Sequence, residues 1–318
     1  MRTHGVPLSQ LSTTDGLWSG RSAFLTVYGQ QFTVHILPMP EFIIEASKSW
    51  FRVPWRELLH YRDLLFLLVR RDFVSRYKQT ILGPAWFVIQ PLVTTLVFTV
   101  IFGSIAKIST DKLPPMLFYL CGMLAWQYFA QCMQGTSTTF VTNAGLFGKV
   151  YFPRLVVPLS VIISNLAAFV IQLVTFLCFW LFYKFFTSSG GLFTATPWIL
   201  ALPILLLQTA AIGLGVGLWM SALTAKYRDF VHISAFLTQL WMYATPVVYP
   251  LSVVPEKWRW VSAINPMSGI VEAYRYAFLG TGTVSPLYLG ISAITTLILL
   301  FTGVLVFSRT ERTFIDTV

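Results

Sequence analysis

The sequence predicts an all-α membrane protein with six transmembrane helices, an N-terminal amphipathic interfacial helix and two short re-entrant helices before the last span. Charge placement is the main observation: from residue 79 to residue 308, charged side chains fall into five clusters that separate six charge-free runs. A spanning helix needs about 20 mostly apolar residues, so each run is long enough to cross a bilayer. The runs are 79–106, 113–148, 155–183, 185–225, 230–255 and 276–308.

Composition supports the same fold class. Of the 318 residues, 56% are hydrophobic and 11% are charged, whereas about 25% are charged in a typical soluble protein. The net charge of +10 does not predict a nucleic-acid partner, because the basic residues lie at the ends of hydrophobic runs and form no basic face. Contacts with anionic membrane lipids explain this placement better. Cys121, Cys132 and Cys178 lie in hydrophobic runs without a CxxC pair, as is typical of inert membrane cysteines.

Residues 1–46 form an N-terminal extension of different character. Its apolar stretch, 24–44, is interrupted by polar and proline residues at 35–41 and lacks the order of regions typical of a signal peptide. Two interpretations stay open for this segment: a flexible, disordered extension, or a chain whose true start is Met39.

A basic amphipathic helix is expected within residues 47–79. From Pro54 to Lys78, apolar residues recur at helical spacing between charged ones, and Pro54 stands where a helix can begin. Such a stretch beside a membrane span is predicted to lie along the cytoplasmic surface of the bilayer. Its simplest role is a membrane anchor. The alternative is attraction of an anionic headgroup by its basic residues, Arg70, Arg71, Arg76 and Lys78.

The transmembrane domain is assigned to residues 80–308, followed by a cytoplasmic tail at 309–318. The second and fourth runs are longer than a helix needs, and turn-forming residues show where their helices end or begin. The fourth helix is expected to begin near Pro197. Within it, the GxGxG pattern from Gly213 to Gly217 predicts close helix packing, because no strand precedes it and no acid follows to hold a ribose.

The segment from Pro250 to Gly282 is too polar to span a bilayer and too rich in tryptophan for a plain loop. We expect it to form two short helices that dip into the outer leaflet. Glu272 and Arg275 lie three residues apart, a spacing that suits an ion pair on one helix face.

The basic residues also predict the orientation. Six spans place both termini on one side, and the positive-inside rule identifies that side. With cytoplasmic termini, 13 Lys and Arg residues from Arg52 onward lie inside and six lie outside. The chain is therefore predicted to be a multi-pass protein of the cytoplasmic (inner) membrane with both termini in the cytoplasm.

The predicted spans lack the groups that carry chemistry. All 12 acidic residues lie outside them, and His232 lies only just inside a helix end. Ion-coupled carriers and membrane enzymes need ionisable groups within the bilayer, so we expect neither class, and we predict no catalytic and no metal site. The chain also has no GxxxxGK[ST] phosphate loop. Any uphill transport must therefore take its energy from another protein.

Four segments carry distinctive patterns: RDFVSRYKQTILGPAW at 71–86, GKVYFPR at 148–154, AKYRDF at 225–230 and NPM at 265–267. In this order they resemble the ABC-2 type permeases that export O-antigen, capsule or teichoic acid polysaccharides. The first is similar to the start of span one in that family, the next two to its cytoplasmic loops, and the last to its re-entrant segment. The resemblance extends from about residue 47 to the end of the chain.

The resemblance implies a homodimer of six-span subunits paired with two copies of a separate nucleotide-binding subunit. That partner would bind ATP and Mg²⁺, so no cofactor is expected on this chain. The loop between spans two and three would dock on the ATPase as a coupling helix, with the Phe152 ring filling a cleft and Lys149 and Arg154 at its rim. The residues assigned to coupling are Leu146, Lys149, Tyr151, Phe152, Pro153 and Arg154.

The resemblance also implies a polymer path between the two subunits, along spans one and five. Aromatic faces can stack on sugar rings, although aromatic residues are also ordinary filler in membrane helices. Those expected to line the path are Trp86, Phe87, Phe98, Phe102, Phe236, Trp241, Tyr243 and Tyr249. A lipid-linked head group would enter at Arg70, Arg71, Arg76, Tyr77, Lys78, Leu82 and Gly83. The re-entrant segment carries Asn265, Pro266, Glu272 and Arg275.

The function implied is that of the channel-forming transmembrane subunit of an ATP-driven exporter that moves a lipid-linked polysaccharide across the cytoplasmic membrane. An ABC-2 exporter of a small molecule or lipid is the alternative, which would share the loops but need a closed pocket. The RYKQT sequence at 76–80 favours the polymer class. A membrane-embedded glycosyl- or acyltransferase would carry acidic or histidine clusters at a span end, and the sequence has none.

Overall fold

The computed structural model describes residues 22–27, 30–35, 60–78, 81–150 and 152–314. The chain divides into two compact units, 1–49 and 50–318. In the first unit, β1 (Ser22–Val27) and β2 (Gln30–His35) form an antiparallel hairpin. This hairpin was not expected, because two six-residue strands with few alternating apolar residues give a weak sequence signal. The first part of the expected interfacial helix, up to residue 59, lies outside the described residues.

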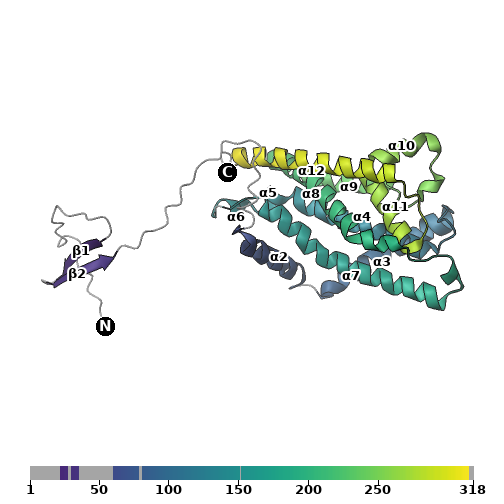
Figure 1. The fold of residues 1–318 in the computed structure, drawn as a ribbon, viewed down its shortest axis with the longest axis horizontal. Coiled ribbons are helices and arrows are strands. Elements are labelled where there is room, and N and C mark those ends of the chain that lie inside the picture. The colour runs from purple at the N-terminus through teal and green to yellow at the C-terminus, as the bar shows by residue number, and fades with distance from the viewer. Residues whose placement is uncertain (1–21, 28–29, 36–59, 79–80, 151, 315–318) are drawn as a thin grey trace. The chain divides into compact units, whose positions relative to one another are not determined.

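In the second unit, all regular elements among the described residues are helices (Figure 1). Its elements, in chain order, are α2 (Arg62–Tyr77), η2 (Gly83–Ala85), α3 (Trp86–Phe98), η3 (Thr99–Ile105), α4 (Pro115–Ser137), α5 (Thr139–Thr142), α6 (Ala144–Phe147), α7 (Val156–Phe186), η4 (Ser188–Gly191), η5 (Pro197–Ala201), α8 (Leu202–Lys226), α9 (Phe230–Ala244), η6 (Leu251–Val253), α10 (Glu256–Ile264), α11 (Pro266–Leu279) and α12 (Pro286–Phe314). The fourth long helical segment begins at Pro197, as expected.

Four helical segments are long and apolar enough to cross a membrane: Gly83–Ile105, Val156–Phe186, Pro197–Lys226 and Pro286–Glu311. They correspond to predicted spans one, three, four and six. The helices in the second and fifth positions are α4, with 23 residues, and α9, with 15 residues. At a rise of about 1.5 Å per residue, α4 is about 34 Å long and α9 about 22 Å long.

Helix α4 forms the centre of the helical unit and packs against α7, α8 and α11. Its side chains are buried along most of its length, and the main apolar core extends from them into α8 and α11. A helix surrounded by other helices can carry polar residues more readily than one that faces lipid. This position explains why α4 is less apolar than α7 and α8.

Helix α8 lies between α4 and α12, and glycines bring the three helices close together. A methyl group on Gly217 would lie 2.6 Å from the Cβ atom of Thr136 on α4. On the other side, a methyl group on Gly215 would lie 2.8 Å from the backbone of Leu299 on α12. Glycines two residues apart point to nearly opposite faces of a helix. The predicted packing role of the GxGxG pattern is confirmed.

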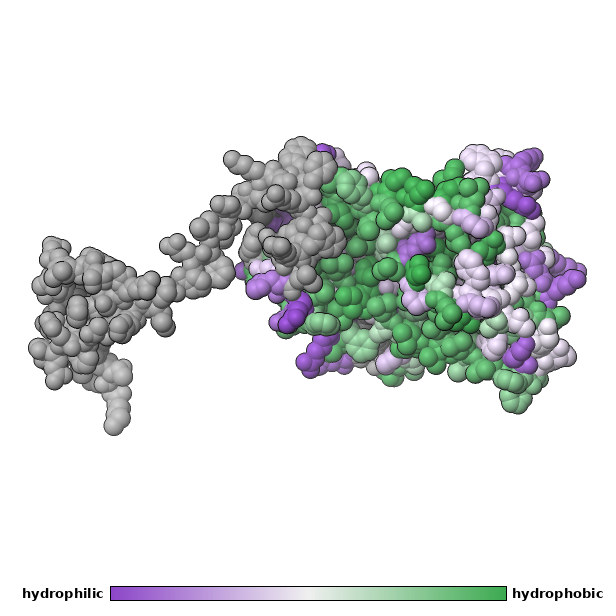
Figure 2. Space-filling model, viewed as in Figure 1, coloured by the Kyte–Doolittle hydropathy of each residue, from purple (hydrophilic) through white to green (hydrophobic). Residues whose placement is uncertain are grey.

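Polar residues gather at the two ends of the helical unit, and an apolar band covers its middle (Figure 2). Helices α2, α5, α6 and the C-terminal end of α12 lie at one end, whereas α10 and α11 lie at the other (Figure 1). At the first end, Arg154 Nη1 donates to the Glu311 carbonyl at 2.9 Å. At the second, Ser252 Oγ donates to Asp111 Oδ1 at 2.8 Å. Arg154 of the predicted inner set thus lies at the end opposite to α10, which carries Lys257 and Arg259 of the outer set.

Gly215→Ala should destabilise the helical unit by about 1–3 kcal/mol, because the added methyl group meets the backbone of α12, which cannot move aside cheaply. Gly290→Ala is the matched control, since a methyl group there meets no atom within 4 Å. The measurement is the midpoint of heat-induced loss of monodisperse protein in detergent. Equal midpoints for the two variants would contradict the packing role.

Candidate functional site

A cavity of about 620 Å³ lies between α3, α4, α7 and α9 and is open on one side. Six glutamines line it, together with aromatic residues from α3 and α4, and no charged side chain is among its described lining residues. We call this cavity the glutamine groove and define it by Gln90, Gln127, Gln131, Gln134, Gln172 and Gln239. Along α3 it extends from Trp86 to Phe98, which is about 18 Å at 1.5 Å per residue.

Helix periodicity explains why three of the glutamines meet. Gln127, Gln131 and Gln134 are spaced four and three residues apart, so they share one face of α4. The opposite face of α4 belongs to the apolar core. Gln90 reaches the groove from α3, where it precedes Pro91, and Gln172 reaches it from α7. One helix therefore supplies both the core and half of the amide groups.

The amide groups of the groove have few partners within the chain. Gln239 Nε2 donates to the Tyr243 hydroxyl at 3.4 Å. Among the described residues, the other five glutamine side chains make no hydrogen bond, and Gln131 Oε1 is fully buried without a partner. A buried polar group without a partner costs about 1–3 kcal/mol. The groove is therefore suited to water or to a ligand rich in hydrogen-bonding groups.

Three of the aromatic residues expected to line a path, Trp86, Phe87 and Phe98, line the glutamine groove. Phe102 packs on Phe98, with ring centroids 5.4 Å apart, instead of lining it. Phe236 is exposed on α9, outside the lining residues of the groove. Their role in a path remains a prediction.

The remaining three aromatic residues take other positions. Trp241 is half-buried and donates from Nε1 to Asn265 Oδ1 at 3.0 Å, so it joins α9 to the start of α11. Tyr243 is exposed on α9 beside Gln239, and Tyr249 is half-buried against the apolar core. Trp241 and Tyr249 are thus placed among other helices rather than in the groove.

The glutamines are functional candidates that were not expected from the sequence. A signal was present, because Gln127, Gln131 and Gln134 form a polar stripe at helical spacing within a charge-free run. The sequence-based expectations for the membrane interior covered only ionisable groups and aromatic side chains. No such signal in the sequence indicated Gln90, Gln172 and Gln239. These residues line the groove only because α3, α7 and α9 pack around α4.

The second candidate site is the loop whose residues were assigned to coupling, and it packs against other parts of the chain. Leu68 of α2, Phe152, Val156 and Val157 form a buried cluster. The Phe152 side chain is only 4% exposed, and its ring lies 5.7 Å from that of Phe147. Within this chain the Phe152 ring therefore fills a gap between α2 and the loop instead of facing outward. The expectation that it fills a cleft of a partner stays a prediction.

Arg154 is buried as well. It is 6% exposed, its Nη1 donates to the Glu311 carbonyl, and its guanidinium carbon lies 5.2 Å from the centre of the Phe147 ring. Burial lowers the pKa of the Arg154 guanidinium, and the Glu311 carboxylate opposes that shift. Arg154 thus ties the loop to the end of α12 and is not exposed in this chain. The expectation that its charge lies at the rim of a partner's cleft stays a prediction.

The surface that the loop does offer lies a few residues earlier. Lys149 is exposed, Val150 is 54% exposed, and Leu146 and Pro153 are half-buried. Tyr151 lies outside the described residues. A partner that docks here would contact Lys149 and Val150 directly.

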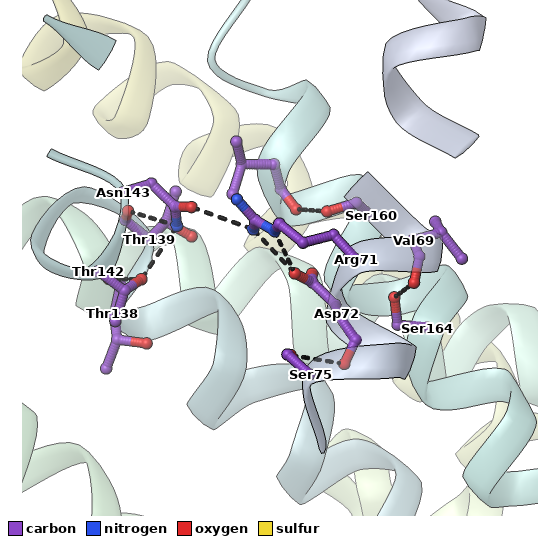
Figure 3. A network of polar contacts seen from close by, with 11 residues as sticks. Val69, Arg71, Asp72, Ser75, Thr138, Thr139, Thr142, Asn143, Ser160 and Ser164 are labelled. Carbon is purple, nitrogen blue, oxygen red and sulfur yellow. Dashed lines mark hydrogen bonds and ion pairs between the residues drawn. The ribbon is translucent and has the colours of Figure 1, made fainter. Parts of the chain in front are cut away.

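Helix α2 is held against this loop by polar contacts (Figure 3). Arg71 Nη2 lies 2.8 Å from Asp72 Oδ1 and donates to Asn143 Oδ1 at 3.3 Å, which links α2 to the turn between α5 and α6. Ser164 Oγ on α7 donates to the Val69 carbonyl at 3.5 Å. Arg71, assigned to the entrance, thus lies in the contact between α2 and the loop.

The other entrance residues are placed as follows. Arg70 is exposed on α2, Lys78 is exposed directly after it, and Leu82 is exposed just before η2. Gly83 has φ of +51°, a conformation that residues with a side chain rarely adopt. The side chains of Arg76 and Tyr77 lie outside the described residues. Leu82 and Gly83 precede Trp86, so the groove begins beside the predicted entrance.

Helices α10 and α11 occupy the segment where two short helices were expected. Asn265, just before Pro266, has both ends of its amide engaged. Its Oδ1 accepts from the Met267 amide at 3.1 Å, and its Nδ2 donates to Thr245 Oγ1 at 2.9 Å. Asn265 therefore fixes the start of α11 against the end of α9.

The expected Glu272–Arg275 pair is present, with 2.9 Å between Oε1 and Nη1. The sequence did not reveal its burial: both side chains are at most 3% exposed. Arg275 Nη2 also donates to the Val247 carbonyl at 2.7 Å, and its guanidinium lies 3.8 Å from the centre of the Phe118 ring. A paired charge with these contacts is tolerated inside a helical bundle.

Residues that could hold a metal are also absent from the described part of the helical unit. No group of three or more His, Cys, Asp or Glu side chains lies together there. The arrangement therefore offers two functional features: a groove of uncharged polar and aromatic groups, and a packed end at which α2, the loop and α12 meet.

Comparison with protein families identifies the architecture. The model of the ABC-2 type transporter family matches residues 63–279, more than half of the 318-residue chain. The chain belongs to the ABC-2 type transporter family. The resemblance seen in the four sequence segments is thereby confirmed.

Curated proteins similar to this ABC-2 chain include three permeases or transport proteins. O-antigen export system permease protein RfbA of Klebsiella pneumoniae is 26% identical over 254 residues, which cover 80% of this chain and 94% of that protein. The RfbA protein of Myxococcus xanthus is 30% identical over 225 residues, 70% of this chain and 83% of that protein. Polysialic acid transport protein KpsM of Escherichia coli is 22% identical over 255 residues, 79% of this chain and 93% of that protein.

In this ABC-2 chain, Phe152→Asp should lower the amount of folded protein in the membrane and cost about 3 kcal/mol or more, because a carboxylate replaces a ring in an apolar cluster. Val150→Asp is the matched control, since the same new side chain then points to solvent. The amount of membrane-inserted protein and its melting midpoint are the measurements. Similar behaviour of the two variants would argue against the packed position of Phe152.

Glu272→Gln should destabilise the ABC-2 domain by about 3–5 kcal/mol, because it leaves the buried Arg275 guanidinium without its counter-charge. Glu256→Gln is the control: Glu256 is exposed in the first turn of α10, where a lost charge costs about 1 kcal/mol or less. Both are measured by heat-induced unfolding in detergent. A drop no larger for Glu272→Gln than for Glu256→Gln would show that the ion pair is not needed.

Proposed function

We propose that this chain is the channel-forming transmembrane subunit of an ATP-driven exporter that moves a lipid-linked polysaccharide across the cytoplasmic membrane. The single observation that carries this proposal is the glutamine groove in an ABC-2 chain. The names of the relatives, which are O-antigen and polysialic acid transport proteins, support the same substrate class.

The lining of the groove is suited to a sliding polymer. Aromatic rings at Trp86, Phe87 and Trp126 can stack on the C–H faces of sugar rings, and neighbouring amides can pair with hydroxyl groups. A single net hydrogen bond contributes only about 0.5–1.5 kcal/mol. Many weak contacts can hold a chain in place without trapping it. The open side of the groove fits a long chain, whereas a small-molecule exporter needs a closed pocket.

The energy for transport is proposed to come from a separate nucleotide-binding subunit, which is present in two copies and binds ATP and Mg²⁺. Lys149 and Val150 are exposed at the packed end where it would dock. Because Phe152 and Arg154 join the loop to α2, α7 and α12, a push on the loop would move these helices together. This chain would bind no cofactor and would not itself be an enzyme.

Six spans, with both termini in the cytoplasm of the inner membrane, are proposed as the topology. Helix α4 is long enough to span about 30 Å of hydrocarbon, whereas α9, with 15 residues, would need the chain after Ala244 to complete the crossing. Helices α10 and α11 would then be the re-entrant pair at the outer face. The basic end with α2 would face the cytoplasm, in line with the positive-inside rule.

A homodimer is proposed because one subunit encloses the groove only in part. The faces of α3 and α9 beside it are apolar and exposed, including Val93 and Leu96 on α3 and Ile233 and Leu240 on α9. Packing of a second copy across these faces would close the open side and place two grooves opposite each other.

Deletion of the gene tests the proposed function. We expect surface polysaccharide to fall to background and lipid-linked polymer to accumulate on the cytoplasmic side, because the only path for export is lost. The measurements are surface polysaccharide content and the accessibility of the lipid-linked pool in right-side-out vesicles, with the native gene restored as the control. Normal surface polysaccharide in the deletion strain would contradict the proposal and favour a small-molecule or lipid substrate.

A further inference from the structure

We propose that the glutamine groove binds electrically neutral, hydroxyl-rich segments of the exported glycan and disfavours segments with a negative charge in every repeat. This inference rests on the proposed export function and adds the charge class of the substrate to it. It assigns to the six glutamines of the groove a role in selecting the substrate by its charge.

The unused hydrogen-bonding capacity of the groove is the first argument. A glutamine amide offers two N–H donors and a carbonyl acceptor, and a sugar hydroxyl both donates and accepts. Each amide can therefore pair with a hydroxyl in either direction. Five of the six side chains make no hydrogen bond among the described residues, and Gln131 Oε1 is buried without a partner. Glutamines that served only to join helices would instead bond across the helix interface.

The absence of charge on the groove wall is the second argument. Among the lining residues that the structure describes, none is acidic or basic. A carboxylate or phosphate that enters a poorly hydrated site loses water contacts, at a cost of several kcal/mol, unless a cation faces it. The buried Arg275 guanidinium is already paired with Glu272, and Lys149 is exposed at the packed end of the unit. A neutral hydroxyl can be desolvated here with a partner in place.

The spacing of the amides is the third argument. Along α4, Gln127, Gln131 and Gln134 lie about 6 and 4.5 Å apart, since an α-helix rises about 1.5 Å per residue. A sugar hydroxyl that breaks its hydrogen bond with one amide can therefore bond to the next amide after the polymer has moved by only one of these spacings. The cavity volume of about 620 Å³ falls in the range of roughly 300–1,000 Å³ that holds a small ligand, enough for a short segment of glycan.

Chemical analysis of the polymer gives the first test. The polysaccharide that disappears from the surface of the deletion strain is purified and its repeat unit analysed for carboxylate and phosphate. A neutral repeat supports the inference. A negative charge in every repeat would overturn it and leave the export function standing. Loss of no polymer at all would count against the export function itself.

Replacement of the glutamines gives the second test. Gln131→Met keeps the length of the side chain but removes its hydrogen-bonding groups, so we expect export per inserted subunit to fall about 3- to 10-fold, as for one lost hydrogen bond. Gln239→Met, at the exposed edge of the groove, should show a similar loss and guards against misfolding of the first variant. Native export rates in both variants would overturn the inference.

The matched control is Gln208→Met. Gln208 lies on α8 and donates to Ser292 Oγ at 2.8 Å, away from the groove. Export is compared at equal amounts of inserted protein, so a purely structural loss is removed from the comparison. Gln208→Met is expected to export at the native rate per subunit. An equal loss in Gln208→Met and Gln131→Met would show that the groove glutamines have no special role.

Discussion

The lack of water in the core of a bilayer is the constraint on which the other features of this structure depend. A polar group there must find a partner within the protein or in what the protein binds. Charged residues accordingly collect at the two ends of the helical unit, and the ion pair of Glu272 and Arg275 is buried only together with carbonyl and aromatic partners. The amides of the glutamine groove have few such partners, which is why they point to a function.

Helix α4 belongs both to the apolar core and to the wall of the proposed polymer path. Helix α4 presents one face to the apolar core and a second face, with Gln127, Gln131 and Gln134, to the groove. The glycines of α8 allow the core side to pack closely, so the polar side is held on a rigid support. The amide groups of these glutamines therefore keep a fixed spacing along α4. A polymer with a regular repeat would contact them at that spacing.

The packed end shows how a docked partner could act on this support. Phe152 and Arg154 do not reach outward; they join the loop to α2, α7 and the end of α12. Since closely packed side chains transmit displacement, a partner that contacts Lys149 and Val150 would move a whole group of helices. The same contacts place α2, and with it the basic residues of the predicted entrance, within that group.

Charge spacing and hydropathy predicted the membrane fold. Short local patterns predicted the start of the helix at Pro197, the packing role of the GxGxG pattern and the Glu272–Arg275 pair, because these depend on residues near one another in the chain. The family also followed from short segments in order. Only the tertiary structure decided that Phe152 and Arg154 are buried and that glutamines from four helices share one groove. Exposure and convergence depend on which helix faces pack together, and that is set by contacts between residues far apart in sequence.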